Sequence, residues 1–144
     1  MASTAPKSKT TAAWLAVLGG SLGLHRFYLH GRRDLRGWLY WPPTLLGLAG
    51  VQRMSAFGQD DGWAWLLIPL LGLSVSFAML GAIVIGLTAD ERWAARHHPA
   101  APVQATGWGP VLAVITALLI GATVLMGTIA FAGQHYFEWL LARP

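Results

Sequence analysis

The chain has 144 residues, of which 55% are hydrophobic and only 11% are charged, and its mean hydropathy is +0.50. A soluble domain carries about 25% charged residues, so this composition excludes a water-facing globule and predicts a small integral membrane protein. The net charge is +4, but the basic residues fall between apolar runs, as membrane-flanking charges do, and we expect no nucleic-acid partner. The absence of cysteine excludes disulfides and thiolate chemistry.

In chain order, a polar leader over 1–10 precedes a predicted helical hairpin over 11–52, whose second arm has Pro42 and Pro43 suited to a first helical turn. A third transmembrane helix is predicted over 63–87 and a fourth over 110–132. Both segments are long enough for the roughly 20 apolar residues that a crossing needs. A polar connection over 88–109 separates them, and an interfacial tail over 133–144 follows. The sequence thus predicts an all-α integral membrane protein of about four helices.

Tryptophans lie at the ends of these segments and never in their middle. Indole rings favour the headgroup level, so this distribution predicts an aromatic belt. The eight residues are Trp14, Trp38, Trp41, Trp63, Trp65, Trp93, Trp108 and Trp139. An alternative for the first segment is a secretory signal with a weak cleavage site at 21–23. The apolar run, however, continues past that site into a compact motif.

The motif is GGSLGLHRFYL over residues 19–29. It resembles the signature of the two-transmembrane-helix (TM-two) domain family, whose bacterial members are often labelled NINE proteins, over about residues 7–52. The resemblance implies a membrane hairpin and a bacterial inner-membrane location, but no common biochemical activity. Two departures stand out: His30 replaces the glycine expected after Leu29, and the second arm lacks the acid that many members carry there.

The motif residues have two alternative roles. Arg26 could recognise a partner or an anionic lipid head, with Asp34 as the nearest acid in the chain, or the motif could be an interfacial anchor with a bend at a glycine. The anchor explains every residue type by membrane depth alone and is the interpretation we favour. The residues concerned are Gly19, Gly20, Gly23, His25, Arg26, Phe27 and Tyr28.

No metal, cofactor or catalytic site is expected. His25 and His30 are five residues apart, whereas helical ligand pairs favour three or four, and the pair at 97–98 lies in a polar loop without a third ligand. The two secure spans contain no charged residue, and therefore no buried acid–base pair or proton relay.

Small residues recur every four positions in the third and fourth segments. Such ridges let two backbones approach closely in lipid, within one chain or against a partner. The predicted packing residues are Ser74, Ala78, Ala82, Gly86, Ala113, Ala117 and Gly121.

Two membrane topologies fit the sequence. In one the chain crosses four times; in the other the first two segments form a re-entrant hairpin. The charge rule favours the hairpin, whereas the family resemblance favours four crossings, which is the topology we adopt. Both place the leader and the 88–102 connection on opposite sides of the membrane.

We therefore expect a non-enzymatic multi-pass membrane protein with a structural or accessory role. Its partners would be the lipid bilayer and other membrane proteins or further copies of itself. A small oligomeric channel or transporter subunit is the alternative, although the spans offer only serine and threonine as a polar lining.

Overall fold

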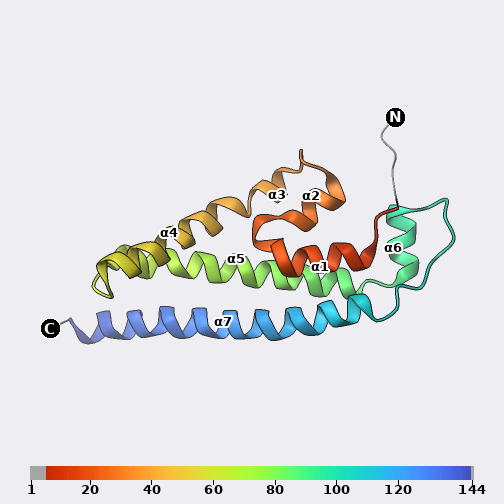
Figure 1. Ribbon diagram of the computed structural model, residues 1–144. Helices are drawn as coiled ribbons and strands as arrows, with labels where there is room; N and C mark the ends of the chain where they lie inside the picture. Colours follow the sequence, from red (N-terminus) through yellow and green to blue (C-terminus); the bar gives the residue numbers. More distant parts are fainter. Residues whose placement is uncertain (1–5, 144) are drawn as a thin grey trace.

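The computed structural model describes residues 6–143, and every regular element in that range is helical (Figure 1). Two long antiparallel helices, α5 (Gly62–Leu87) and α7 (Gly109–Leu141), lie side by side along the molecule. Both are long and apolar enough to cross a membrane. At 1.5 Å per residue, α5 measures about 39 Å, which exceeds a hydrocarbon core of about 30 Å. The protein is an all-α membrane protein.

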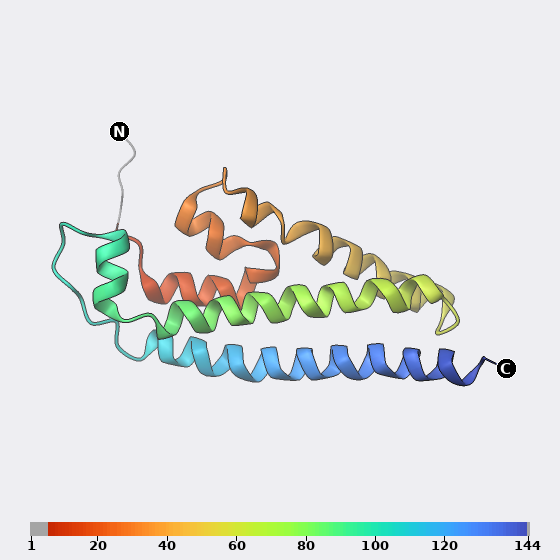
Figure 2. The same ribbon diagram turned by 180° about the vertical axis from the view of Figure 1, so that it is seen from behind.

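The first apolar segment does not form one crossing helix. It comprises α1 (Lys9–Gly19), the 3₁₀ turn η1 (Gly20–Leu22) and α2 (Leu24–His30). The eleven residues of α1 reach only about 16 Å, about half of a bilayer core. At η1 the chain reverses, and α2 runs back beside α1 (Figures 1 and 2). This arm is a re-entrant pair of half-length helices.

The second segment continues from the re-entrant pair to the far end of α5. It is broken into α3 (Leu35–Trp38) and α4 (Trp41–Phe57), and α4 carries prolines in its first turn. Close approaches follow α4 down α5: Gly47 lies against Leu71, and Gly50 lies against Leu67. The helix α4 thus covers the first half of α5, and α3 connects it to the re-entrant pair.

The helix α7 pairs with α5 along its whole length. Near its start, Val114 and Pro110 approach Gly86, whereas near its end Phe131 and His135 stack on Trp65. The sequence placed the end of the fourth helix at residue 132, but the helix continues unbroken to Leu141. The glycine at position 133 lies within the helix and does not cap it, so the tail prolongs the span.

The leader lies at the same end of the molecule as the connection between α5 and α7. That connection contains α6 (Asp90–His97). The Lys9 ammonium donates to the Thr88 carbonyl at 2.9 Å, and the indole N–H of Trp93 donates to the Lys7 carbonyl at 2.9 Å. The expectation that the leader and the 88–102 connection lie on opposite sides is therefore wrong. The expectation failed because both predicted topologies gave the first two segments the same path, either both crossing or both re-entrant, whereas only the first segment turns back.

The fold gathers most of the basic residues toward one end of the molecule. Eight of the ten Lys and Arg lie in the leader, in α2 and the α2–α3 region, or in α6, and the other two, Arg53 and Arg143, lie toward the opposite end. A one-sided excess of this kind is typical of an inserted membrane protein.

Candidate functional site

The re-entrant turn is the most unusual feature of the fold, and the glycines of the motif make it possible. Gly23 has φ +71°, which favours glycine, and a Cβ there would collide with the Gly37 carbonyl. A Cβ on Gly20 would lie 2.6 Å from the Ala78 Cβ of α5, and one on Gly19 would collide with Leu24. The three glycines thus let the turn bend and let it pack against α5 and α3.

Breaking a helix inside a bilayer leaves backbone carbonyls that need donors. No backbone N–H of the described part reaches the carbonyls of Ser21 and Leu22. Two side chains of α4 supply the missing donors. The Thr44 hydroxyl donates to Ser21 at 2.6 Å, and the indole N–H of Trp41 donates to Leu22 at 3.1 Å. Thr44 in turn shares a buried 2.7 Å hydrogen bond with Ser74 of α5.

His25 is the buried polar centre of the turn. It is only 4% exposed, and the edge of its ring meets Tyr40 with centroids 5.7 Å apart. Its Nε2 lies over the open side of Gly81 in α5. Its Nδ1 has no hydrogen-bond partner among residues 6–143. The histidine therefore contributes shape and packing to the junction of α2, α4 and α5.

Arg26 makes a specific ion pair. Its Nε donates to the Asp34 carboxylate at 2.8 Å, and His30 stands 3.7 Å from the same oxygen. Desolvation opposes ionisation of Asp34, but hydrogen bonds from Arg26 and from the Arg36 backbone hold its pKa below the ordinary value. The pair closes the α2–α3 turn, so the guanidinium does more than mark a membrane depth.

The aromatic residues of the motif also have defined contacts. Phe27 packs edge-on against Trp38, with ring centroids 5.3 Å apart, and covers the face of Gly37 where a Cβ would stand. The Tyr28 hydroxyl accepts a 3.0 Å hydrogen bond from the Ser8 backbone. Tyr28 therefore ties the end of the re-entrant pair to the leader.

A second polar cluster anchors the leader at the end of α5. Lys9 is 5% exposed and pairs with Asp90, whose carboxylate also accepts hydrogen bonds from the Thr106 hydroxyl and backbone. These hydrogen bonds, the one from Lys9 first, lower the pKa of Asp90 below its ordinary value. One carboxylate thus joins the leader, α6 and the loop before α7. The pattern of apolar runs carries no signal for this cluster.

The predicted packing residues lie at contacts between helices of this one chain. Ala78 and Ala82 of α5, Ala113 and Ala117 of α7, and Ala13 and Ala16 of α1 form the core, all with no exposed surface. Ser74 is buried on α5, and Gly86 and Gly121 permit close contacts with Val114 and Met79. The small residues therefore join helices within one chain, and α1 is a third participant that the two-ridge interpretation did not include.

The histidines at 97 and 98 are engaged in structural contacts. His97 stacks on Trp93, and its Nδ1 lies 3.2 Å from the Trp93 carbonyl; burial lowers its pKa. His98 Nε2 lies 3.1 Å from the Lys7 carbonyl. Within residues 6–143 no group of three metal-ligating side chains is present.

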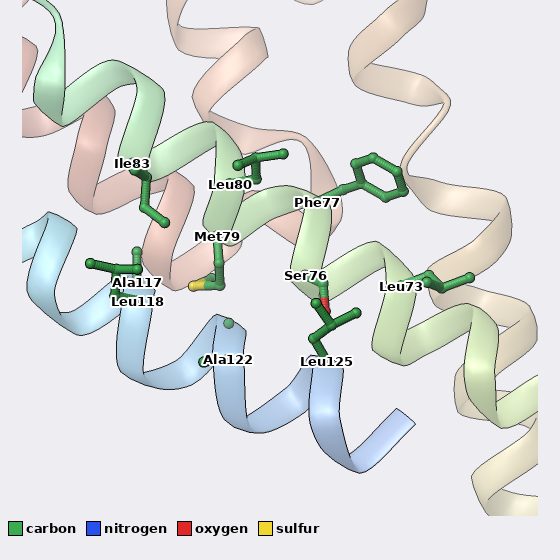
Figure 3. Close-up of a pocket in the computed structure, with 11 residues that line it drawn as sticks. Leu73, Ser76, Phe77, Met79, Leu80, Ile83, Ala117, Leu118, Ala122 and Leu125 are labelled. Carbon is green, nitrogen blue, oxygen red and sulfur yellow. The ribbon is translucent and has the colours of Figure 1, made fainter. Parts of the chain in front are cut away.

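An open apolar groove of about 350 Å³ runs between α5 and α7 (Figure 3). Met79 points from α5 toward Ala122 and Ala117 of α7, whereas Phe77 and Leu80 point to the side of α5 away from α7. These two side chains also line a second hollow, on the α2 side of α5. They form a ridge between the two grooves.

These features define a multi-pass α-helical membrane protein whose first arm is re-entrant. Residues 5–71 match the family described as the TM2 domain, which confirms the resemblance suggested by the motif. The matched region reaches the middle of α5, the helix on which the re-entrant turn packs. No match was found among curated proteins or among solved structures.

Proposed function

We propose that this protein is a non-enzymatic accessory or structural component of a bacterial inner membrane, and that it acts through helix contacts with another membrane protein. The basic end, which holds the leader and α6, faces the cytoplasm in this proposal, because Lys and Arg accumulate on that side. The proposal depends mainly on the outer surface of α7.

On the surface of α7 that faces away from α5, a line of residues follows alternating steps of three and four positions. This spacing is that of a left-handed helix–helix seam. Most of the seam lies opposite the small residues that pack on α5, and Ala122 lies at the border of the groove against α5. The helix α7 is apolar on most of its faces, so the feature that favours a partner helix over lipid is the pair of small residues in the seam, which permit close approach. Its members are Leu112, Ile115, Leu119, Ala122, Met126, Ile129, Gly133 and Tyr136.

The use of the polar groups supports a role in binding over one in catalysis. Asp34, Asp61 and Asp90 each hold a cation of the same chain in an ion pair. Each pair closes a turn or fastens a terminus, which is a structural task. Three of the six carboxylates are thereby occupied, and the other three, those of Asp60, Glu91 and Glu138, are exposed at the surface.

The hydroxyl groups argue against the channel alternative. Ser76 donates to the carbonyl of Gly72, and Thr123 donates to the carbonyl of Leu119, each within its own helix. Thr116 and Thr128 do the same. Hydroxyls that bond back to their helix offer little to a passing ion.

The test is purification in mild detergent with quantification of co-purifying chains. Gly133→Leu places a bulky side chain on the seam, and Gly127→Leu is the matched control on another face of α7; a Cβ at either position would have no neighbouring atom within 4 Å. We expect Gly133→Leu to lose the partner several-fold and Gly127→Leu to retain it. Recovery of a lone chain, or equal loss in both variants, would contradict the proposal. Capture of a second copy alone would replace the partner by self-association.

A further inference from the structure

A hollow of two adjoining parts lies between α2, the second half of α5 and α6. One part, about 340 Å³, is lined by Arg26, Leu29 and His30 on one wall and by α5 on the other. Leu29 and His30 also line the next part, which extends to Arg92 and Arg96 of α6. The hollow therefore runs from the apolar middle of α5 to the polar end of the molecule.

The α5 wall of the hollow is apolar and open. Phe77, Leu80 and Val84 follow one another at three- and four-residue spacing, so they lie on one face of the helix. Each is more than half exposed. Phe77 and Leu80 also border the groove against α7 (Figure 3). An acyl chain could lie on each side of this ridge.

The upper rim of the hollow is strongly basic. Arg92 and Arg96 are exposed, stand one helical turn apart on α6 and are in no ion pair of the described residues. Arg26 lines the other part of the hollow, and its charge is paired with Asp34. A neighbouring hollow between the leader and α6 adds Lys7. No aspartate or glutamate of the described residues lines any of these hollows.

We propose that this hollow binds an anionic phospholipid. The phosphate lies at Arg92 and Arg96, where guanidinium groups can donate paired hydrogen bonds to its oxygens. The acyl chains run down α5 over Val84, Leu80 and toward Phe77. A free phosphate would satisfy the rim but would leave the exposed apolar wall uncovered, and a zwitterionic lipid would bring an unneeded cation to a rim that is already basic.

The position of the hollow along the bilayer agrees with this ligand. The rim lies at the end of α5 that holds eight of the ten Lys and Arg. The cytoplasmic leaflet carries the anionic lipids and attracts such basic segments. This inference does not use the α7 seam, although Ala122 of the seam lines the groove between α5 and α7. It rests on the cytoplasmic side proposed above for the basic end.

The test is native mass spectrometry of the purified protein in detergent with equimolar phosphatidylglycerol and phosphatidylcholine. Wild type should retain phosphatidylglycerol at least five-fold over phosphatidylcholine, and the double variant Arg92→Gln/Arg96→Gln should lose this preference. The matched control is Arg32→Gln/Arg33→Gln, which removes the same charge from exposed residues that line none of these hollows. The control should keep the preference.

Two further measurements separate the lipid from its headgroup. Glycerol 3-phosphate in excess should not displace the bound lipid, and Leu80→Asn, which alters only the apolar wall, should weaken lipid retention. Displacement by the soluble phosphate, or a preference that survives Arg92→Gln/Arg96→Gln, would overturn the proposal. Equal loss in the Arg32→Gln/Arg33→Gln control would also overturn it, because attraction to a basic surface would then suffice.

Discussion

Thr44→Val should destabilise the protein because Thr44 supplies the donor that the broken backbone needs. Valine keeps the shape of the side chain but removes the hydroxyl that donates to Ser21 at 2.6 Å and bonds Ser74 at 2.7 Å. A buried acceptor left without a partner costs about 1–3 kcal/mol, whereas hydrogen bonds between membrane helices average about 0.6 kcal/mol. We expect a loss of about 1–3 kcal/mol, since a main-chain carbonyl loses a donor that no backbone group replaces.

The free energy of unfolding can be measured by titration with SDS in mixed micelles, followed by tryptophan fluorescence and circular dichroism. Thr116→Val is the matched control. The Thr116 hydroxyl donates at 2.9 Å to the Leu112 carbonyl within a continuous helix, so its removal should change stability by less than about 0.5 kcal/mol. If the two variants lose the same free energy, then Thr44 does not complete the re-entrant turn.

Three further predictions concern packing and charge. Ala82→Leu should weaken helix association by about 0.5–2 kcal/mol, because Ala82 has no exposed surface, whereas Leu80→Ala, at a half-exposed position, should matter less; similar losses in the SDS titration would contradict this. Arg26→Lys should lower the thermal stability in detergent, because an ammonium on a flexible stem cannot reproduce the Nε contact with Asp34. An unchanged melting temperature would favour the interpretation of the motif as an interfacial anchor. The pKa of Asp90 is depressed in the folded state, so the contribution of Asp90 to stability is present above the unfolded value near 3.8 and is lost as the pH falls through the folded pKa. Asp90→Asn should therefore flatten the dependence of the melting temperature on pH in that acidic range, and an unchanged dependence would count against the ion pair.

The sequence predicted the elements whose cause is local. An uninterrupted apolar run over 63–87 becomes α5, whose observed bounds are Gly62–Leu87. The glycines of the motif indicated a bend, and the chain reverses there, although the reversal lies within the first arm of the hairpin predicted over 11–52. Asp34 was identified as the nearest acid to Arg26, and the two form an ion pair. In each case the signal lies within the feature itself or close to it along the chain.

The parts that sequence reasoning missed depend on contacts between distant segments. In the sequence Thr44 is an ordinary threonine after two prolines, and only the three-dimensional fold brings it into contact with Ser21 and Ser74. The ion pair of Lys9 with Asp90 joins residues that are 81 positions apart. Counting apolar residues also could not show that the first arm turns back, because His25 and Arg26 are compatible with the end of a crossing helix as well as with a return helix.

The re-entrant first arm places the leader and α6 on one side of the membrane and the α4–α5 turn on the other. Because the chain has no cysteine, single cysteines at Ser8, Ala95 and Gln59 can be labelled in sealed vesicles with a membrane-impermeant maleimide; all three positions are exposed. We expect Ser8→Cys and Ala95→Cys to react from the same side and Gln59→Cys to react from the opposite side. Labelling of Ser8→Cys and Ala95→Cys from opposite sides would contradict the re-entrant arm.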